Sequence, residues 1–149
     1  MFQLSISTKI KALLPLFLLL LSSCDSTKST IPTEPVSLQV NLLQYTSLLS
    51  LGATMSFITS TTTTSLGFGG VLVVHTLDDT YAAFDLACPY EAVDTIRVAV
   101  QSDLTVKCSH CGSRYRITDG SGWVISGPST QKLKSYSVYP SNNYLYVTN

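Results

Sequence analysis

The sequence predicts an all-β fold in a single domain. Beyond Val36, short runs rich in Val, Tyr, Thr and Phe recur between turn signals, as they do in chains built from strands. No segment in this part keeps a helical period of apolar residues over three turns. Without its first 23 residues the 149-residue chain leaves 126, which is enough to bury the core of one domain and too few for two.

Ten strands are expected in order along the chain. They cover residues 37–42, 54–59, 71–76, 81–86, 97–100, 105–107, 115–117, 124–126, 136–139 and 144–147. Residues 77–80 and 141–143 are expected as hairpin connections, which Asp and Asn favour, and residues 118–122 as a longer turn. Residues 43–51 are expected to form one short helix or a loop. The Ser/Thr run at 59–65 predicts a mobile surface loop, with a Thr-rich strand edge as the alternative.

The first 23 residues are typical of a secretory signal with a lipobox. Lys9 and Lys11 precede an apolar run at residues 12–21, which ends in Leu21-Ser22-Ser23-Cys24. The run of about ten residues is too short for the roughly 20 that cross a bilayer, so it indicates a cleaved signal and not a membrane span. We expect acylation of Cys24 and anchoring to a membrane of the bacterial cell envelope. A plain signal peptide with an incidental Cys is the alternative.

Two further segments follow from composition. Residues 24–36 comprise the lipidated Cys and a Ser/Thr/Pro tether, and residues 37–149 form the folded domain. After cleavage, seven Lys and Arg stand against nine Asp and Glu, which gives a net charge of −2. The basic residues are scattered and form no stripe that would bind phosphates, so we expect no nucleic-acid partner.

Two short Cys loops are the chemically most informative feature. Cys88-Pro89-Tyr90 and Cys108-Ser109-His110-Cys111 each follow an expected strand, and residues 91–107 separate them. Loops that end strands can bring their thiolates onto one centre, and clustered thiolates hold a soft cation or an iron–sulfur cluster. This spacing predicts a metal or iron–sulfur site.

At these residues the chain resembles the Rieske family, whose site is C-x-H, a spacer of about this length, and C-x-x-H. Further matches follow the order of the family's strands and loops. They lie at residues 70–74, 81–85, 112–115, 119–120, 127–128, 133–136 and 145–147. The resemblance implies an antiparallel β-sandwich with a small cluster-binding subdomain made of the two Cys loops. It also implies that Gly127-Pro128 covers the cluster.

The resemblance implies a [2Fe-2S] cluster held by Cys88 and Cys108, but Tyr90 and Cys111 stand where the family has its two His ligands. A thiolate from Cys111 can replace one of them and would lower the reduction potential. The fourth ligand is left between His110 and Tyr90, and for Tyr90 simple packing is favoured over ligation. The set of Cys88, Cys108, Cys111 and His110 also suits tetrahedral zinc. A disulfide between Cys88 and Cys108 or Cys111 is the alternative without metal.

Two functions remain open from the sequence. The first is a membrane-anchored lipoprotein that binds a [2Fe-2S] centre and exchanges electrons with an envelope redox partner. The second is a cluster-free Rieske fold that uses its Cys loops for zinc or a disulfide and acts as a structural or binding module. No catalytic triad, Gly-rich phosphate loop or H-E-x-x-H pattern occurs, so we expect no enzyme activity from this protein by itself. His75 and Trp123 are expected to be structural.

Overall fold

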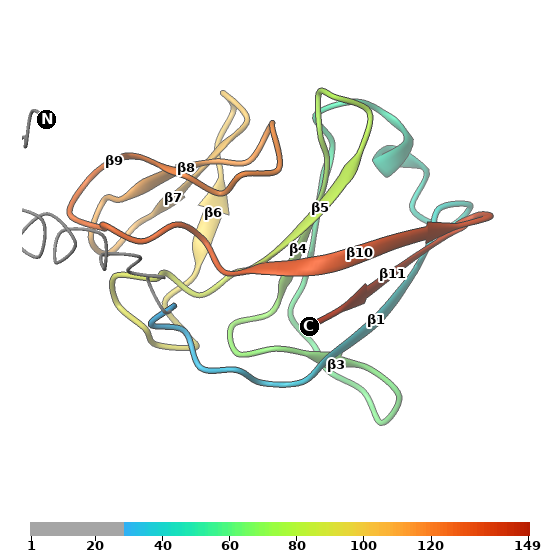
Figure 1. Cartoon of the computed structure of the whole chain (residues 1–149), viewed down its shortest axis with the longest axis horizontal. Helices are drawn as coiled ribbons and strands as arrows, with labels where there is room; N and C mark the ends of the chain where they lie inside the picture. The colour runs from blue at the N-terminus through green and yellow to red at the C-terminus, as the bar shows by residue number, and fades with distance from the viewer. Residues whose placement is uncertain (1–28) are drawn as a thin grey trace, which may run out of the picture.

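A computed structural model describes residues 29–149 and contains two antiparallel β-sheets (Figure 1). The predicted signal peptide, Cys24 and the first part of the tether lie outside the described residues. Within residues 29–149, no helix is both long and apolar enough to cross a membrane. The only helical element described is a short 3-10 turn, η1 (Thr46–Leu49), which accounts for the helix or loop expected at residues 43–51. The all-β prediction is therefore confirmed.

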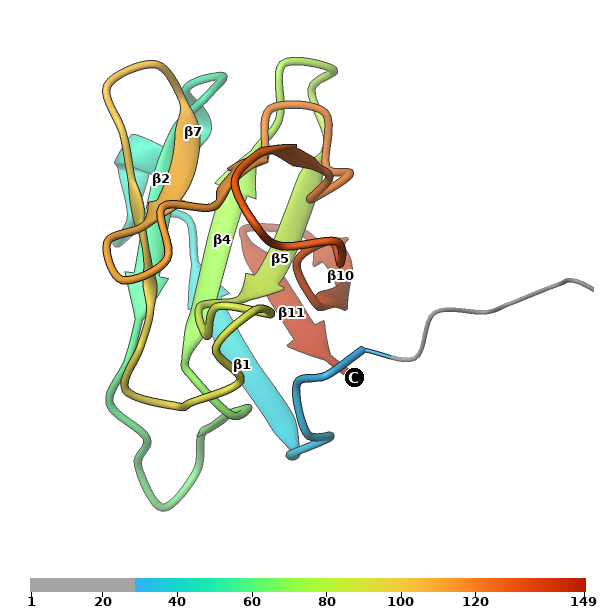
Figure 2. The ribbon, with the colours of Figure 1, turned by 90° about the vertical axis from the view of Figure 1, so that its left-hand side faces the viewer.

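The larger sheet has seven strands in the order β2-β4-β5-β10-β11-β1-β3. Their bounds are β1 (Val36–Asn41), β2 (Thr54–Phe57), β3 (Ser65–Leu66), β4 (Val71–His75), β5 (Tyr81–Asp85), β10 (Ser135–Ser141) and β11 (Tyr144–Thr148). The sheet curls, so that β1 runs obliquely to β4 and β5 (Figure 2). The two-residue strand β3 is the one element that the sequence did not predict, because two residues are too few to show alternation.

The smaller sheet has four strands in simple sequence order, β6 (Val98–Val100), β7 (Thr105–Cys108), β8 (Arg114–Arg116) and β9 (Val124–Ser126). It lies at one end of the molecule, on the left in Figure 1. Its strands are only three or four residues long. The second predicted Cys loop connects β7 to β8, and the first leads from β5 into β6.

Strand β4 joins the two hydrophobic cores because it is buried on both faces. Its odd-numbered residues, Val71 and Val73, pack into the core of the larger sheet. Its even-numbered residues, Leu72 and Val74, pack into a second core that also contains Cys88 and Cys108. This explains why residues 71–74 form a continuous apolar run and do not alternate, as is usual for a strand covered on both sides. Cys88 and Cys108 therefore share a core with a strand that is buried along its whole length.

A buried carboxyl group fixes the point where β5 leads into the first Cys loop. Asp85 is fully buried and accepts hydrogen bonds from the backbone N–H groups of Phe68, Gly69 and Ala87 at 2.7–3.0 Å. The Tyr136 hydroxyl donates a fourth at 2.5 Å. Four donors satisfy a buried carboxyl group that would otherwise be costly. Asp85 thereby ties β5 to β10 and to the turn before β4, three residues ahead of Cys88.

The part of the expected tether that the structure describes packs onto the domain. Ile31 is buried, and the Thr30 backbone N–H donates to the Gln131 side chain at 2.9 Å. The Thr30 hydroxyl donates to the Pro89 carbonyl, and the Lys134 ammonium donates to the Pro32 carbonyl. Packing of the domain thus begins before residue 37.

Candidate metal centre

The first Cys loop is held closed by its own backbone. The Cys88 N–H donates to the Ile96 carbonyl, and the Cys88 carbonyl accepts from Ala92 N–H, both at 2.9 Å. Ala87 and Arg97 form an isolated bridge at the base of the loop. Cys88 itself is fully buried. The loop therefore presents the Cys88 thiol inward at the end of the small sheet.

The second Cys loop is a tight turn at the end of β7. The Cys108 N–H donates to the Ser113 carbonyl at 2.9 Å, and the Gly112 N–H donates to the Cys108 carbonyl at 3.0 Å. Gly112 has a φ of +80°, in the left-handed region that Gly adopts without strain. Cys108 is fully buried, whereas Cys111 is partly exposed. The turn thus brings two thiols of one C-x-x-C segment to the same side.

The three thiols meet. The Sγ atoms of Cys88, Cys108 and Cys111 all lie within 4.8 Å of one another, and those of Cys88 and Cys111 are 3.6 Å apart. Two thiolates bound at about 2.3 Å to one tetrahedral ion are separated by roughly 3.8 Å. The three sulfur atoms therefore have the spacing needed to share a metal centre. Spacing in the sequence predicted this convergence.

The environments of the two facing thiols differ. Burial raises the pKa of Cys88 to about 11, although backbone groups of the loop and the Tyr115 hydroxyl, 3.6 Å from its Sγ, act in the opposite direction. Burial acts to raise the pKa of Cys111, but hydrogen bonds with Ser113, whose Oγ lies 3.2 Å from its Sγ, and with the Cys88 and Cys108 thiols together outweigh burial and lower that pKa. A bound cation would favour the thiolate form of both. Without one, Cys111 is the more readily ionised thiol.

The resemblance implies that Gly127-Pro128 covers the cluster, and in the structure the loop after β9 packs against Ser113, at the end of the second Cys loop. The Ser129 backbone N–H donates to the Ser113 hydroxyl at 3.1 Å. Gly127 has a φ of +99°, and a Cβ atom there would lie 2.5 Å from the Ser113 Cα. Only glycine fits between the two loops at this position. We call residues 127–130 the lid.

His110 and Tyr90, the two candidates for a fourth ligand, do not join the thiols in this structure. The His110 Nδ1 lies 2.7 Å from a Glu91 carboxylate oxygen, and its side chain is 66 % exposed. The hydrogen bond to Glu91 and its charge raise the pKa of His110. Tyr90 is 54 % exposed. A ligand role for either requires a different side-chain position and stays a prediction.

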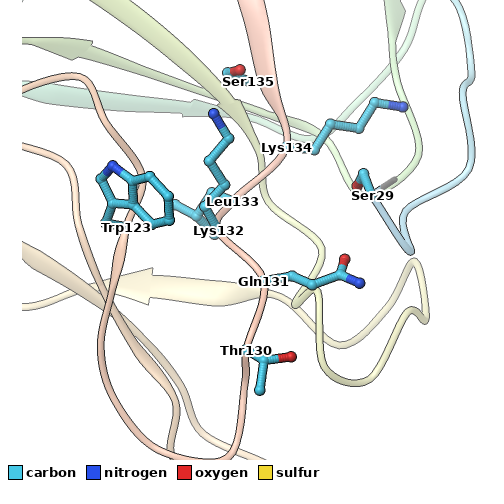
Figure 3. Close-up of a pocket in the computed structure, with 8 residues that line it drawn as sticks. All are labelled: Ser29, Trp123, Thr130, Gln131, Lys132, Leu133, Lys134 and Ser135. Carbon is cyan, nitrogen blue, oxygen red and sulfur yellow. The ribbon is translucent and has the colours of Figure 1, made fainter. Parts of the chain in front are cut away.

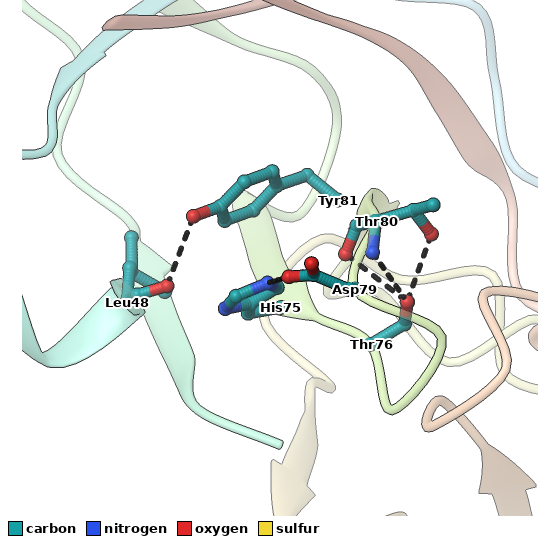
Figure 4. A network of polar contacts seen from close by, with 6 residues as sticks. All are labelled: Leu48, His75, Thr76, Asp79, Thr80 and Tyr81. Carbon is teal, nitrogen blue, oxygen red and sulfur yellow. Dashed lines mark hydrogen bonds and ion pairs between the residues drawn. The ribbon is translucent and has the colours of Figure 1, made fainter. Parts of the chain in front are cut away.

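His75, the second histidine, has a structural environment (Figure 4). Its Nε2 lies 2.9 Å from the Asp79 carboxylate, and its ring stacks on Tyr81 at 4.4 Å between centroids. The Tyr81 hydroxyl donates to the Leu48 carbonyl of η1 at 3.2 Å. These contacts fasten the 77–80 hairpin and η1 to the end of β4. No thiol takes part in them.

Sequence reasoning missed Ser113, Tyr115, Ser129 and Glu91 as neighbours of the site. Ser113 and Tyr115 follow the C-x-x-C segment directly, so proximity in sequence was a usable signal for them. Glu91 follows Cys88-Pro89-Tyr90 in the same way. Ser129 gave no such signal, because it reaches the site from the separate loop after β9.

Comparison with solved structures shows which known fold this domain resembles. No family model matches the sequence, and no curated protein matches it either. A fluorene-bound variant oxygenase, solved in the ferredoxin complex of carbazole 1,9a-dioxygenase, aligns with a TM-score of 0.51 at 16% identity. The alignment covers 80% of this chain and 30% of that one. The terminal oxygenase of carbazole 1,9a-dioxygenase from Novosphingobium sp. KA1 aligns at 18% identity with a TM-score of 0.49, over 77% of this chain and 29% of that one.

These solved chains are Rieske-type terminal oxygenases, and the fold described here is Rieske-like. At such identities the likeness concerns the fold alone. The chain spans less than a third of their length.

The three converging thiols match the ligands of a Rieske [2Fe-2S] cluster only in part. A Rieske cluster takes two Cys and two His ligands, whereas here three thiols converge and no imidazole joins them. Three of four ligands are therefore in place, and all three are soft. The set fits a thiolate-bound metal centre with one position left for a further ligand.

Proposed function

We propose that this chain is a metal-binding lipoprotein of the bacterial cell envelope, in which Cys88, Cys108 and Cys111 hold a [2Fe-2S] centre for single-electron transfer. The observation that carries the proposal is the convergence of the three thiol sulfurs within 4.8 Å at the end of a Rieske-like domain. Anchoring rests on the lipobox that ends at Cys24. Electron exchange would be with a partner protein. The solved relatives are oxygenases in complex with a ferredoxin, which supports a partner of that kind.

The residues of this chain would contribute binding and environment. A [2Fe-2S] centre supplies one-electron oxidation and reduction when bound. Cys88 and Cys108 offer thiolates from a buried, apolar core, and Cys111 offers one from the partly exposed side. Tyr115 and Ser113 place hydroxyl groups beside two of the sulfurs, and the lid packs against Ser113 at the end of the second loop. Three thiolates predict a lower potential than a site with two His ligands.

Zinc is the second candidate, and a specific observation favours it. The Cys88 and Cys111 sulfurs are 3.6 Å apart, close to the spacing of two ligands on one tetrahedral ion, and all three sulfurs lie within 4.8 Å of one another, whereas ligands on two different irons stand farther apart. Under this assignment the chain is a structural or binding module that uses zinc to join its two Cys loops. A fourth zinc ligand would come from water, His110 or a partner.

The test is metal and sulfide analysis of the full-length protein, extracted in detergent without oxygen from cells supplied with iron and cysteine. Near two irons and two acid-labile sulfides per chain, with a paramagnetic signal after one-electron reduction, is the expected result. About one zinc per chain without sulfide would replace the first assignment by the second. A metal-free chain that is lighter by two hydrogens would contradict both and indicate a disulfide.

A further inference from the structure

A surface next to the start of the described chain combines an exposed indole with two ammonium groups. Ser29, Trp123, Lys132 and Lys134 all line one shallow pocket (Figure 3). Trp123 is 60% exposed, and the Lys132 Nζ lies 5.8 Å from the centre of its ring. We call these four residues the Trp123 surface.

The N-terminal segment is fixed where it meets this surface. Thr30 donates to the Gln131 side chain and to the Pro89 carbonyl, and Ile31 is 2% exposed. Ser29 is therefore not a freely placed end. Its position relative to Trp123 and the two lysines is set by packing.

The length of chain between Ser29 and the predicted lipid attachment is short. Five residue steps separate Cys24 from Ser29. Even fully extended, they span no more than about 18 Å, at 3.3–3.6 Å per residue. Acyl chains on Cys24 would thus hold the Trp123 surface within a short distance of the lipid headgroups.

The chemistry of the surface suits such a position. Indole rings favour the interface between headgroups and hydrocarbon, and lysines attract anionic lipids while their stems cover apolar surface. Among residues 29–149, neither Lys132 nor Lys134 forms an ion pair with a carboxylate. Asp119, a carboxylate shortly before Trp123, is paired with Arg116 at 3.6 Å. Along the N-terminal segment the acids are Asp25, which precedes the described residues, and Glu34.

We propose that the Trp123 surface docks on the headgroup region of an anionic bilayer, so that the domain sits on the membrane in one orientation. This inference rests on the lipid anchor of the proposed function. We assign a membrane as the binding partner because Ser29, which belongs to the Trp123 surface, follows the predicted lipid attachment at Cys24 by only five residues. Charge complementarity points the same way, since Lys132 and Lys134 bring two positive charges that no carboxylate of residues 29–149 pairs with, on a chain whose mature net charge is −2. The Lys134 ammonium donates to the Pro32 carbonyl.

The orientation would also place the thiol centre. Thr30 binds Pro89 in the first Cys loop and Gln131 just after the lid. The segment that leads toward Cys24 is therefore attached to the first Cys loop and to the loop after β9, which contains the lid. The centre would lie at the membrane-proximal end of the domain, within reach of a partner embedded in the same membrane.

Trp123 provides the test because it is the only Trp in the sequence. The full-length protein, purified from membranes, is reconstituted into vesicles of phosphatidylcholine with phosphatidylglycerol, and into the same vesicles carrying a spin label near the headgroups. We expect a blue-shifted Trp emission that the spin label quenches. In K132Q/K134Q the docked fraction should fall, with a roughly 25-fold lower docking constant at about fivefold per lysine. K107Q, which removes a cation from β7 elsewhere on the domain, should behave like the unmodified protein.

Emission that matches a water-exposed Trp and is not quenched, in protein whose Cys24 carries acyl chains by mass spectrometry, would overturn the docking while leaving the anchor intact. Quenching that is equal in K132Q/K134Q would also overturn the proposal. A mass spectrum without acyl chains on Cys24, together with protein that does not bind vesicles, would instead reject the anchor and the docking with it. Metal content, measured on the same samples, reports on the centre independently.

Discussion

The two sheets of this protein are stabilised in different ways. The seven-stranded sheet encloses an apolar core of alternating side chains, and its single buried carboxyl group, Asp85, has four hydrogen-bond donors. The four-stranded sheet has short strands and buries two thiols and Tyr115 beside them. Its loops are joined by the contact of His110 with Glu91, by the hydrogen bond from the Ser129 backbone N–H to the Ser113 hydroxyl, and by a close approach at Gly127. The large sheet is stabilised by apolar packing and one satisfied carboxyl group, whereas the small sheet also brings three thiol groups close together.

The comparison predicts that changes in the small sheet affect metal binding and changes in the large sheet affect folding. Cys108→Ser removes a buried central ligand and should reduce bound metal from stoichiometric to near zero, a loss in affinity of more than about 100-fold. Metal analysis and far-ultraviolet circular dichroism of the same sample check both halves of the prediction. Ser109→Ala, in the same loop, should retain the metal. Full metal content in Cys108→Ser would show that the thiols do not act together.

The largest effect expected in the other sheet comes from Asp85→Asn. An amide nitrogen at the Oδ1 position would face the backbone N–H groups of Gly69 and Ala87 and leave both without an acceptor. At the Oδ2 position it would leave the Phe68 N–H without one, although the Tyr136 hydroxyl can turn to accept. We expect a loss of about 3 kcal/mol in the free energy of unfolding, measured with denaturant. Asp78→Asn, on the exposed 77–80 turn, should leave the curve unchanged. Equal curves for both variants would contradict the role given to Asp85.

The two facing thiols should differ in reactivity when no metal is bound. At pH 8 a thiol with a pKa of about 11 is ionised in roughly one molecule in a thousand, and Cys88 is also buried. Because the pKa of Cys111 is lowered and its side chain is partly exposed, its thiolate forms at lower pH. Iodoacetamide should therefore modify Cys111 at least about 100-fold faster than Cys88, as followed by peptide mass spectrometry. In urea the two rates should converge; faster modification of folded Cys88 would contradict the geometry.

The smallest of these effects on unfolding is expected at Gly127, and Gly112 is its matched control; both lie in loops next to the small sheet. Gly127→Ala would place a Cβ atom 2.5 Å from the Ser113 Cα, whereas a Cβ atom at Gly112 would meet nothing within 4 Å. Both glycines have positive φ, so backbone strain of about 1 kcal/mol is common to both substitutions. We expect Gly127→Ala to cost about 2 kcal/mol more than Gly112→Ala, because the lid must move. Similar unfolding midpoints would mean that the lid does not rest on Ser113.

Sequence reasoning succeeded where the signal was local. Short runs of strand-forming residues between turn signals predicted β4, β5, β10 and β11, each to within two residues at both ends. Cys spacing predicted the meeting of three thiols. It failed to find Asp85, because an Asp at the end of a strand has no special pattern and its donors come from three separate segments. The sequence could not place the side chains of His110 and Tyr90, because contacts such as that of His110 with Glu91 depend on how the two Cys loops pack together.

The central claim is that Cys88, Cys108 and Cys111 share one metal centre. X-ray absorption at the metal edge of the full-length protein tests this most directly, because it counts the sulfur ligands. We predict at least three sulfur neighbours at about 2.3 Å from the metal, with the count reduced in Cys111→Ser. A metal surrounded by oxygen and nitrogen ligands only, or a spectrum that is the same in Cys111→Ser, would contradict the account.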